Sequence, residues 1–310
     1  MKSRLASPFV HNGSVDPGRS YACHLAIASM ALALMVSCGP SRPTLTGPAA
    51  VYENAKLAFA RGDLESYERA LGFLESLTSA DPPNDYTNRA RVLRAIISGG
   101  ELEGYKTLSE AYGTGASATK VPGPKSEYTS LERDTMRRGA ELTLEIGESA
   151  MRLTKGNTIP KDLTLEAPYP SVEPPESVPV LDRVRQGLKI GQDDEAQAAL
   201  DAPRAGVADA LAEVVGGNRS EVRSKMNAGP VPLDSAEFAL FLAKRVMAGA
   251  SLYDKKHLYD PEKFKVLAGI ADGAAQASAA ALEQASDPEK AKSLKKLREE
   301  IKAALKASQS

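Results

Sequence analysis

The feature that most constrains the fold of this chain is the spacing of its apolar residues, which recur every three or four positions over long segments. Such a spacing places apolar side chains on one face of an α-helix, whereas a half-buried strand alternates apolar and polar residues. Trp is absent and aromatic residues make up 5% of the chain, so strand-forming runs are scarce. The sequence therefore predicts an all-α fold. Apolar stripes occupy residues 49–61, 64–77, 86–97, 102–112, 136–151, 181–200, 233–254, 261–285 and 294–305.

Glycines and acidic residues predict where several of these helices end and begin. Gly62 is expected to close one helix, and Asp63 to cap the next by accepting hydrogen bonds from its free N–H groups. The pair Gly99–Gly100 predicts a second break, because glycine is a poor helix former. Helices joined by such short turns predict stacked helical hairpins.

Further helix starts are predicted by capping residues and prolines. Thr129 and Glu132 fit a capping box at the start of a helix. The sequence Asp-Pro-Glu-Lys occurs at 260–263 and at 287–290, with Asp suited to the N-cap and Pro to the first helical position. The two helices that follow are expected to form an antiparallel hairpin at the end of the chain.

Proline-rich and glycine-rich segments divide the chain into regions. We expect a flexible tether at 38–48, an N-terminal helical-hairpin region at 49–155 and a C-terminal helical region at 180–310. Residues 156–179 between them contain six prolines, too many for a helix. This segment is either a linker that wraps the surface or a segment that binds a partner. A shorter linker is expected at 113–126.

The first 37 residues have the features of a cleaved export signal. Arg19 precedes an apolar run from Ala22 to Val36, which is shorter than the roughly 20 residues needed to span a bilayer. The run leads into Met35-Val36-Ser37-Cys38, which resembles the lipobox of bacterial lipoproteins, although Met35 stands where leucine is usual. The resemblance implies that residues 1–37 are a signal peptide and that Cys38 becomes the lipidated N-terminus. It also implies that Gly39 directs the protein to the outer membrane, facing the periplasm.

Two similar stretches, RGDLESYERAL at 61–71 and SGGELEGYKTL at 98–108, indicate a repeated unit. Their glycines, Gly62 and Gly100, are 38 residues apart, a period found in helical solenoids. The first stretch, and GQDDEAQAAL at 191–200, resemble the turn of tetratricopeptide repeats. The resemblance implies an α-solenoid of stacked hairpins with a concave groove for peptides or partner helices.

Four tyrosines are candidates to line such a groove. Their side chains also fall on the apolar stripes, so burial in the core is the alternative interpretation. The candidates are Tyr52, Tyr67, Tyr105 and Tyr112.

The sequence offers few groups for catalysis or metal binding. His257 is the one histidine after the signal peptide, and a zinc site needs three or four protein ligands, so its acidic neighbours indicate a charged turn. Glu148–Ser149 resembles the catalytic Glu-Ser of lytic transglycosylases, which need a glutamate with a raised pKa in an apolar pocket. The further Gly-Leu-Met-Gln-type segment of that family is missing. We therefore expect no enzyme activity, no cofactor and no metal.

These features together predict a membrane-anchored periplasmic lipoprotein that acts as a protein-interaction scaffold, with an envelope protein or peptide as its partner. The net charge of −1 gives no cationic field that would attract nucleic acid. Two alternatives stay open. One is a small-ligand-binding or transport-accessory lipoprotein with a cavity between the two helical regions, and the other is a cell-wall hydrolase that uses Glu148.

Overall fold

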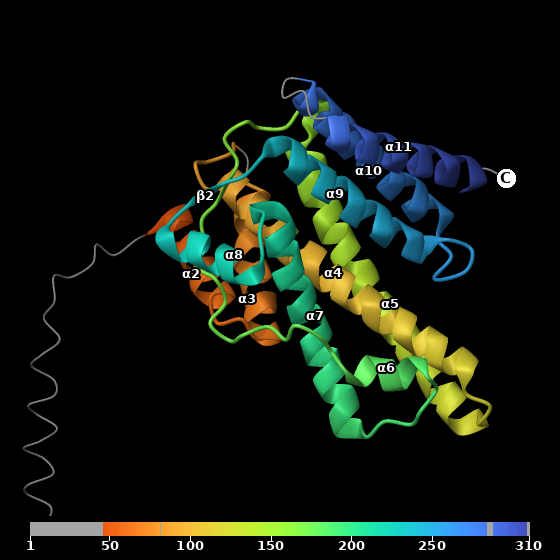
Figure 1. Cartoon of the computed structure of the whole chain (residues 1–310). Helices are drawn as coiled ribbons and strands as arrows, with labels where there is room; N and C mark the ends of the chain where they lie inside the picture. Colours follow the sequence, from red (N-terminus) through yellow and green to blue (C-terminus); the bar gives the residue numbers. More distant parts are fainter. Residues whose placement is uncertain (1–45, 81, 284–287, 309–310) are drawn as a thin grey trace, which may run out of the picture. The chain divides into compact units, whose positions relative to one another are not determined.

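Figure 1 shows the computed structural model, which describes residues 46–80, 82–283 and 288–308. Helices dominate these residues and pack as hairpins, which confirms the predicted all-α fold. The helices are α2 (Gly47–Phe59), α3 (Leu64–Thr78), α4 (Thr87–Ala118), α5 (Pro122–Leu153), α6 (Val180–Arg185), α7 (Gln192–Val215), α8 (Arg219–Ala228), α9 (Ser235–Ala250), α10 (Pro261–Leu282) and α11 (Pro288–Ser308). Two short 3₁₀ turns, Lys155–Asn157 and Ser251–Tyr253, and two short strands, β1 (Thr164–Leu165) and β2 (Val231–Pro232), complete the order.

The corner between α2 and α3 is built as the sequence predicts. Gly62 has φ +83°, a left-handed conformation that glycine adopts at little cost. Asp63 caps α3, and its carboxylate accepts a hydrogen bond of 2.9 Å from the N–H of Ser66. Phe59 of α2 stacks on Tyr67 of α3 with ring centroids 5.6 Å apart. The first hairpin is therefore fixed by local capping and by buried aromatic contact.

The predicted break at Gly99–Gly100 is wrong, because α4 continues through both glycines from Thr87 to Ala118. Each glycine in a helix interior costs about 1 kcal/mol relative to alanine. Tertiary packing offsets that cost here. A Cβ atom on Gly99 would lie 2.8 Å from the Cδ1 atom of Ile146 in α5, so the missing side chain makes room for the neighbouring helix.

Glycines also allow α4 and α7 to cross with their backbones in contact. A Cβ atom on Gly100 would overlap the Cα atom of Val207, and one on Gly104 would overlap the carbonyl of Ala202. On the α7 side, a Cβ atom on Gly206 would overlap the carbonyl of Gly100. The stretch around Gly100 is therefore a helix-crossing site, whereas Gly62 forms a corner. The two similar stretches of sequence do not occupy equivalent places in the fold.

The end of α4 and the start of α5 lie at other residues than predicted. Residues 113–118 belong to α4, and α5 begins at Pro122, so the expected linker at 113–126 shrinks to three residues. Pro122 fits the first turn of a helix, where a missing N–H costs nothing. Thr129 and Glu132 lie inside α5 and form no capping box there; the Thr129 hydroxyl donates to the carbonyl of Lys125 at 2.9 Å.

No α-helix forms between Leu153 and Val180, as the six prolines predict. This segment, residues 158–179, runs as an extended strap that pairs β1 with β2 and buries Leu163, Leu165 and Tyr169. Proline-rich backbone offers carbonyl acceptors but few N–H donors, so side chains supply the donors. Arg204 donates to the carbonyl of Glu173 at 2.8 Å, and Arg219 donates to that of Pro175 at 2.8 Å. The strap is therefore held on α7 and α8, and Thr46–Ser310 is one compact unit.

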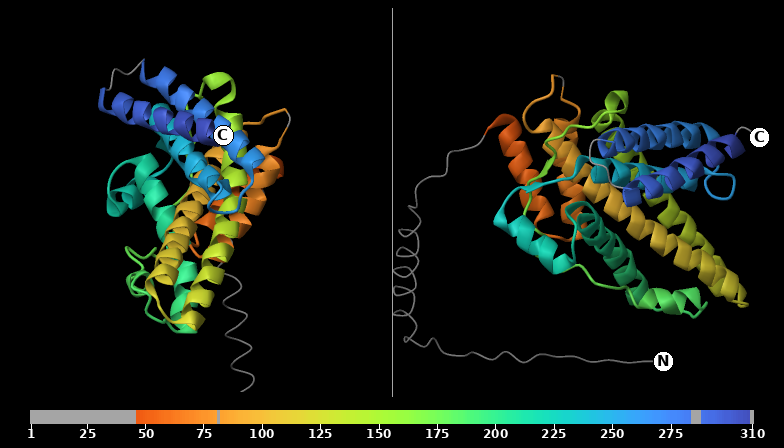
Figure 2. Two further views of the ribbon diagram at one scale, coloured as in Figure 1. Left: turned by 90° about the vertical axis from the view of Figure 1, so that its right-hand side faces the viewer. Right: turned by 45° about the horizontal axis from the view of Figure 1, so that its top comes forward.

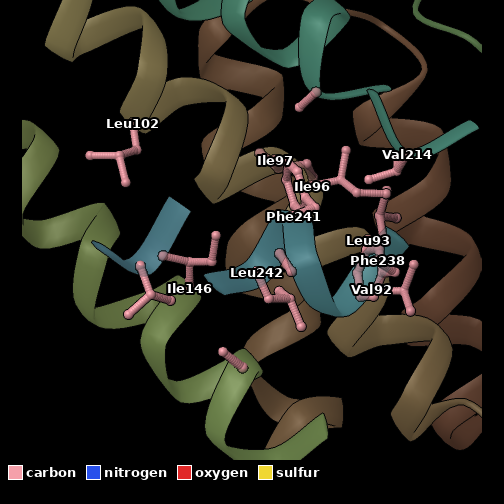
Figure 3. Packing of buried hydrophobic residues seen from close by; sticks show 14 of the residues in the cluster. Val92, Leu93, Ile96, Ile97, Leu102, Ile146, Val214, Phe238, Phe241 and Leu242 are labelled. Carbon is pink, nitrogen blue, oxygen red and sulfur yellow. The ribbon is translucent and has the colours of Figure 1, made fainter. Parts of the chain in front are cut away.

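The C-terminal helices follow the predicted pattern. Asp260 caps α10 through the N–H of Lys263, and Pro261 takes the first helical position. Asp287, the predicted cap of α11, lies outside the described residues. Both views of Figure 2 show α10 beside α11. The inward stripe of α9 meets α4 and α5 in the core, where Phe238, Phe241 and Leu242 pack with Leu93, Ile96 and Ile146 (Figure 3).

The crossing of α4 and α7 predicts a large effect of one added methyl group. We expect Gly104→Ala to lower the free energy of unfolding by about 2 kcal/mol or more, because the Cβ atom overlaps backbone that cannot move alone. Gly72 provides a matched control, since it lies exposed on α3 with no atom near its absent Cβ. Gly72→Ala should stabilise the protein by roughly 0.5–1 kcal/mol. Chemical denaturation measures both, and equal effects would contradict the crossing.

Candidate functional site

Charged and polar side chains gather where α3, α4 and α5 meet, and we call this cluster the polar seam. Burying charged groups is costly unless they find partners, so such a cluster is the strongest chemical feature of the described chain. A single face of α4 carries Arg94, Ser98, Glu101 and Tyr105, each three or four residues from the next. The polar seam comprises these four residues with Glu68 and Thr78 of α3 and Arg138, Glu145, Glu148 and Arg152 of α5.

Arg94 is the cation at one end of the polar seam. Its side chain is almost fully buried and donates to the carboxylate of Glu148 at 2.9 Å and to the hydroxyl of Thr78 at 3.2 Å. Glu148 also pairs with Arg152, at 2.9 Å. Partial burial acts to raise the pKa of Glu148, but the two guanidinium groups outweigh it and lower that pKa below its ordinary value. Glu148 is therefore ionised at neutral pH, the opposite of a general acid.

Glu145 lies next to Arg94 and is held less tightly. Its carboxylate accepts a hydrogen bond of 3.1 Å from Ser98 and lies 3.9 Å from the Nε atom of Arg94. Burial raises the pKa of Glu145 above its ordinary value, although Arg94 and Ser98 act to lower it. The two carboxylates of α5 thus differ because only Glu148 has a close charged partner on both sides.

Glu101 stands at the centre of the polar seam with no exposed surface. Neither of its carboxyl oxygens has a hydrogen-bond partner. Burial raises the pKa of Glu101 to about 8; Arg138 acts to lower it, and Glu145 and Glu68 act to raise it further. Glu101 is therefore a neutral carboxylic acid at neutral pH. No substrate can touch it in this arrangement, because the surrounding helices cover it completely.

All four candidate groove tyrosines are buried, which corrects the expectation that they line a groove. Tyr52, Tyr67 and Tyr112 are at most 1% exposed, and Tyr105 is 8% exposed. The Tyr52 hydroxyl donates to the carbonyl of Glu166 in the strap at 3.2 Å. A tyrosine ring buries a large apolar area, so a helical stripe that contains one turns it toward the core. In the structure these tyrosines are core residues, which is the alternative interpretation of the apolar stripes.

The other sequence candidates lie apart from the polar seam. His257 lies in the loop before α10, where its Nδ1 atom is 2.8 Å from the carboxylate of Asp254 and 3.0 Å from the carbonyl of Ser251. The predicted charged turn is therefore present, and Tyr259 in the same loop has φ +48°. Among the described residues, no three His, Cys, Asp or Glu side chains form a group that could hold a metal ion. Cys38 lies outside the described residues.

An apolar groove runs between α5 and α10, on the surface rather than in the core. Leu144 and Met151, expected on the inner face of α5, are 47% and 53% exposed and line it with Val266, which is 61% exposed. The helices approach closely at Gly147, where a Cβ atom would lie 3.0 Å from Leu267, and side chains on either side of this point stay uncovered. The groove encloses about 390 Å³ and opens to solvent.

Sequence reasoning missed both the polar seam and this groove. The face of α4 that carries Arg94, Ser98, Glu101 and Tyr105 has helical spacing, which would have revealed a polar stripe had α4 been recognised as continuous. The groove left no such signal, because Leu144 and Met151 have the spacing of core residues.

Comparisons with known proteins do not assign this chain to a family. No protein-family model, curated protein or solved structure matches it. In the part of the chain that the structure describes, no helix has both the length and the apolar character needed to cross a membrane.

The polar seam predicts that Arg94 matters far more than an exposed arginine. We expect Arg94→Leu to lower the free energy of unfolding by about 2 kcal/mol or more, because Thr78 and the half-buried Glu148 lose their shared donor. Arg137 on α5 is the control, since its pair with Asp134 is exposed. Arg137→Leu should change stability by less than about 0.5 kcal/mol. Thermal and chemical denaturation compare the two, and a harmless Arg94→Leu would contradict the proposed network.

Proposed function

We propose that this protein is a lipid-anchored, periplasm-facing scaffold of helical hairpins that binds an envelope protein. The anchor part of the proposal rests on the sequence around Cys38, which follows a short apolar run and precedes a polar segment rich in glycine and proline. The resemblance of this segment to the lipobox of bacterial lipoproteins supports membrane attachment, and Gly39 supports the outer membrane as its location.

The observation that carries the binding role is the apolar groove between α5 and α10. Scattered exposed apolar residues are normal on a protein surface, but three large ones lining a single groove indicate an interaction site. An apolar groove between two helices suits an amphipathic helix laid in it, with apolar anchors three or four residues apart. We therefore propose an amphipathic helix of a partner protein as the occupant. The tetratricopeptide resemblance of the sequence is in keeping with such a role.

The geometry favours this function over the two alternatives. A small-ligand carrier is expected to enclose its ligand. The groove between α5 and α10 is open to solvent, and so is a second one that α4 and α7 line together with the strap and α6. A cell-wall hydrolase that uses Glu148 needs this group as a proton donor with a raised pKa. Partial burial acts in that direction, but Arg94 and Arg152 lower the pKa of Glu148 instead. A binding protein without catalysis, cofactor or metal is therefore the better-supported proposal.

The anchor proposal predicts that one substitution detaches the protein from membranes. Cys38→Ala removes the thiol that would carry the lipid, so the protein should move from the membrane fraction to the soluble fraction and fail to incorporate labelled palmitate. Globomycin should block processing of the wild-type protein. Membrane fractionation and palmitate labelling measure these outcomes, and unchanged membrane attachment of Cys38→Ala would contradict the anchor.

The groove proposal predicts that polar substitutions remove binding and leave the fold intact. A photo-crosslinking residue at position 270 in the groove of the membrane-bound protein should give a discrete adduct with a partner. Combining Leu144→Ser with Met151→Ser should reduce this adduct by about tenfold or more, because two partly exposed anchors are lost. Leu57→Ser on α2, 64% exposed and outside the groove, is the matched control and should leave the adduct unchanged. An adduct that survives the double substitution would contradict the groove as the binding site.

A further inference from the structure

Glu101 is the most isolated ionisable group among the described residues. Its side chain has no exposed surface, and neither carboxyl oxygen has a hydrogen-bond partner. An ionised carboxylate in such a place costs several kcal/mol unless a cation or several donors compensate it. The state of this carboxyl therefore depends on what the surrounding helices place near it.

The charged groups around Glu101 offer no spare compensation. From α3, Glu68 brings a second negative charge, and from α5, Glu145 brings a third. The one nearby cation is Arg138 of α5, and it is already engaged by Glu68, by Glu141 at 3.1 Å and by the Tyr105 hydroxyl. Like charges on two sides and a cation shared among other partners disfavour the ionised form of Glu101.

The remaining polar neighbour is a tyrosine that shares the same isolation. Tyr67 of α3 lies within electrostatic range of Glu101, and its buried hydroxyl also has no hydrogen-bond partner. Arg204 of α7 and Tyr169 of the strap also act electrostatically on Tyr67. A neutral carboxyl and a neutral hydroxyl tolerate this apolar contact between α3 and α4, whereas a carboxylate does not.

We propose that Glu101 is a proton-binding switch: its neutral carboxyl allows α3 to stay packed against α4, and its ionisation opens the polar seam at α3. The opening occurs at α3 because this helix has 15 residues, whereas α4 and α5 have 32 each and pack along most of their length. This inference is independent of the anchor and of the α5–α10 groove.

The direction of the pH effect follows from the two states of the chain. In the unfolded chain Glu101 loses its proton near its ordinary pKa of 4.5, while burial keeps the proton bound in the fold up to about pH 8. Between these values the folded state holds one more proton than the unfolded state, so stability falls as the pH rises. Below this window both states are protonated, and above it both are ionised.

The test compares the full chain with its Glu101→Gln variant from pH 5 to pH 8.5. Glutamine keeps the size and polarity of the protonated acid but cannot ionise. The folding equilibrium constant of the wild type, relative to that of the variant, should fall by about a hundredfold or more over this range. Hydrogen exchange of the α3 amides, corrected for its intrinsic pH dependence, should accelerate above pH 8 in the wild type and not in the variant. Parallel stability profiles, or exchange of α3 that is the same in both proteins, would overturn the proposal.

Two matched variants separate this effect from simple loss of a polar group. Glu103→Gln lies two residues away on α4 and removes a carboxylate that pairs with Arg245 at 2.7 Å, so it should weaken the fold and leave the Glu101 slope in place. Tyr67→Phe removes a neighbouring buried hydroxyl that has no partner and should leave the slope unchanged. Should Glu101→Gln fail to fold, carbon NMR of labelled glutamate in the wild type decides the question. A carboxyl that titrates near pH 8 supports the proposal, and ordinary midpoints for every glutamate overturn it.

Discussion

The contact on which the rest of the structure depends is the crossing of α4 and α7, where two helix backbones touch. Gly100 and Gly104 on α4 and Gly206 on α7 leave no side chain between the helices. Besides α7, α4 contacts α3, α5, α6 and α9. The continuous α4 therefore packs against helices of both helical regions. These contacts join the hairpins at the two ends of the described chain into one compact unit.

The same central position explains why α4 carries the buried charges. Residues 90–102 of α4 are buried on every side of the helix, so polar side chains in this stretch must find partners within the protein. Arg94 donates hydrogen bonds to Glu148 and Thr78, and its positive charge helps to lower the pKa of the Glu148 carboxylate. Glu101 has no such partner, and its raised pKa follows from burial. One helix face thus holds a guanidinium group with a charged partner and a neutral carboxyl without one.

The proposed binding site lies on the surface of this protein rather than in its core. The tyrosines that the sequence offers as groove residues are buried, and the apolar side chains that it assigns to the core lie in the α5–α10 groove. Both differences from the prediction have the same cause: the exposure of a side chain depends on how much of it the neighbouring helix covers. At Gly147 the Leu267 side chain of α10 lies against α5, whereas Leu144 and Met151, about one turn away on either side, are left partly exposed.

The all-α class, the corner at Gly62 and Asp63, the cap at Asp260 and the helix-free strap can be predicted from local sequence, because local propensity and hydrogen bonding decide each of them. Tertiary packing, by contrast, is the reason that Gly99–Gly100 continues a helix, since the cost of two glycines is offset by helices far away in the chain. It also decided which members of an apolar stripe are covered, and whether a buried carboxyl meets a cation. Periodicity identifies a face of a helix, but the neighbours that pack on this face determine what each residue on it does.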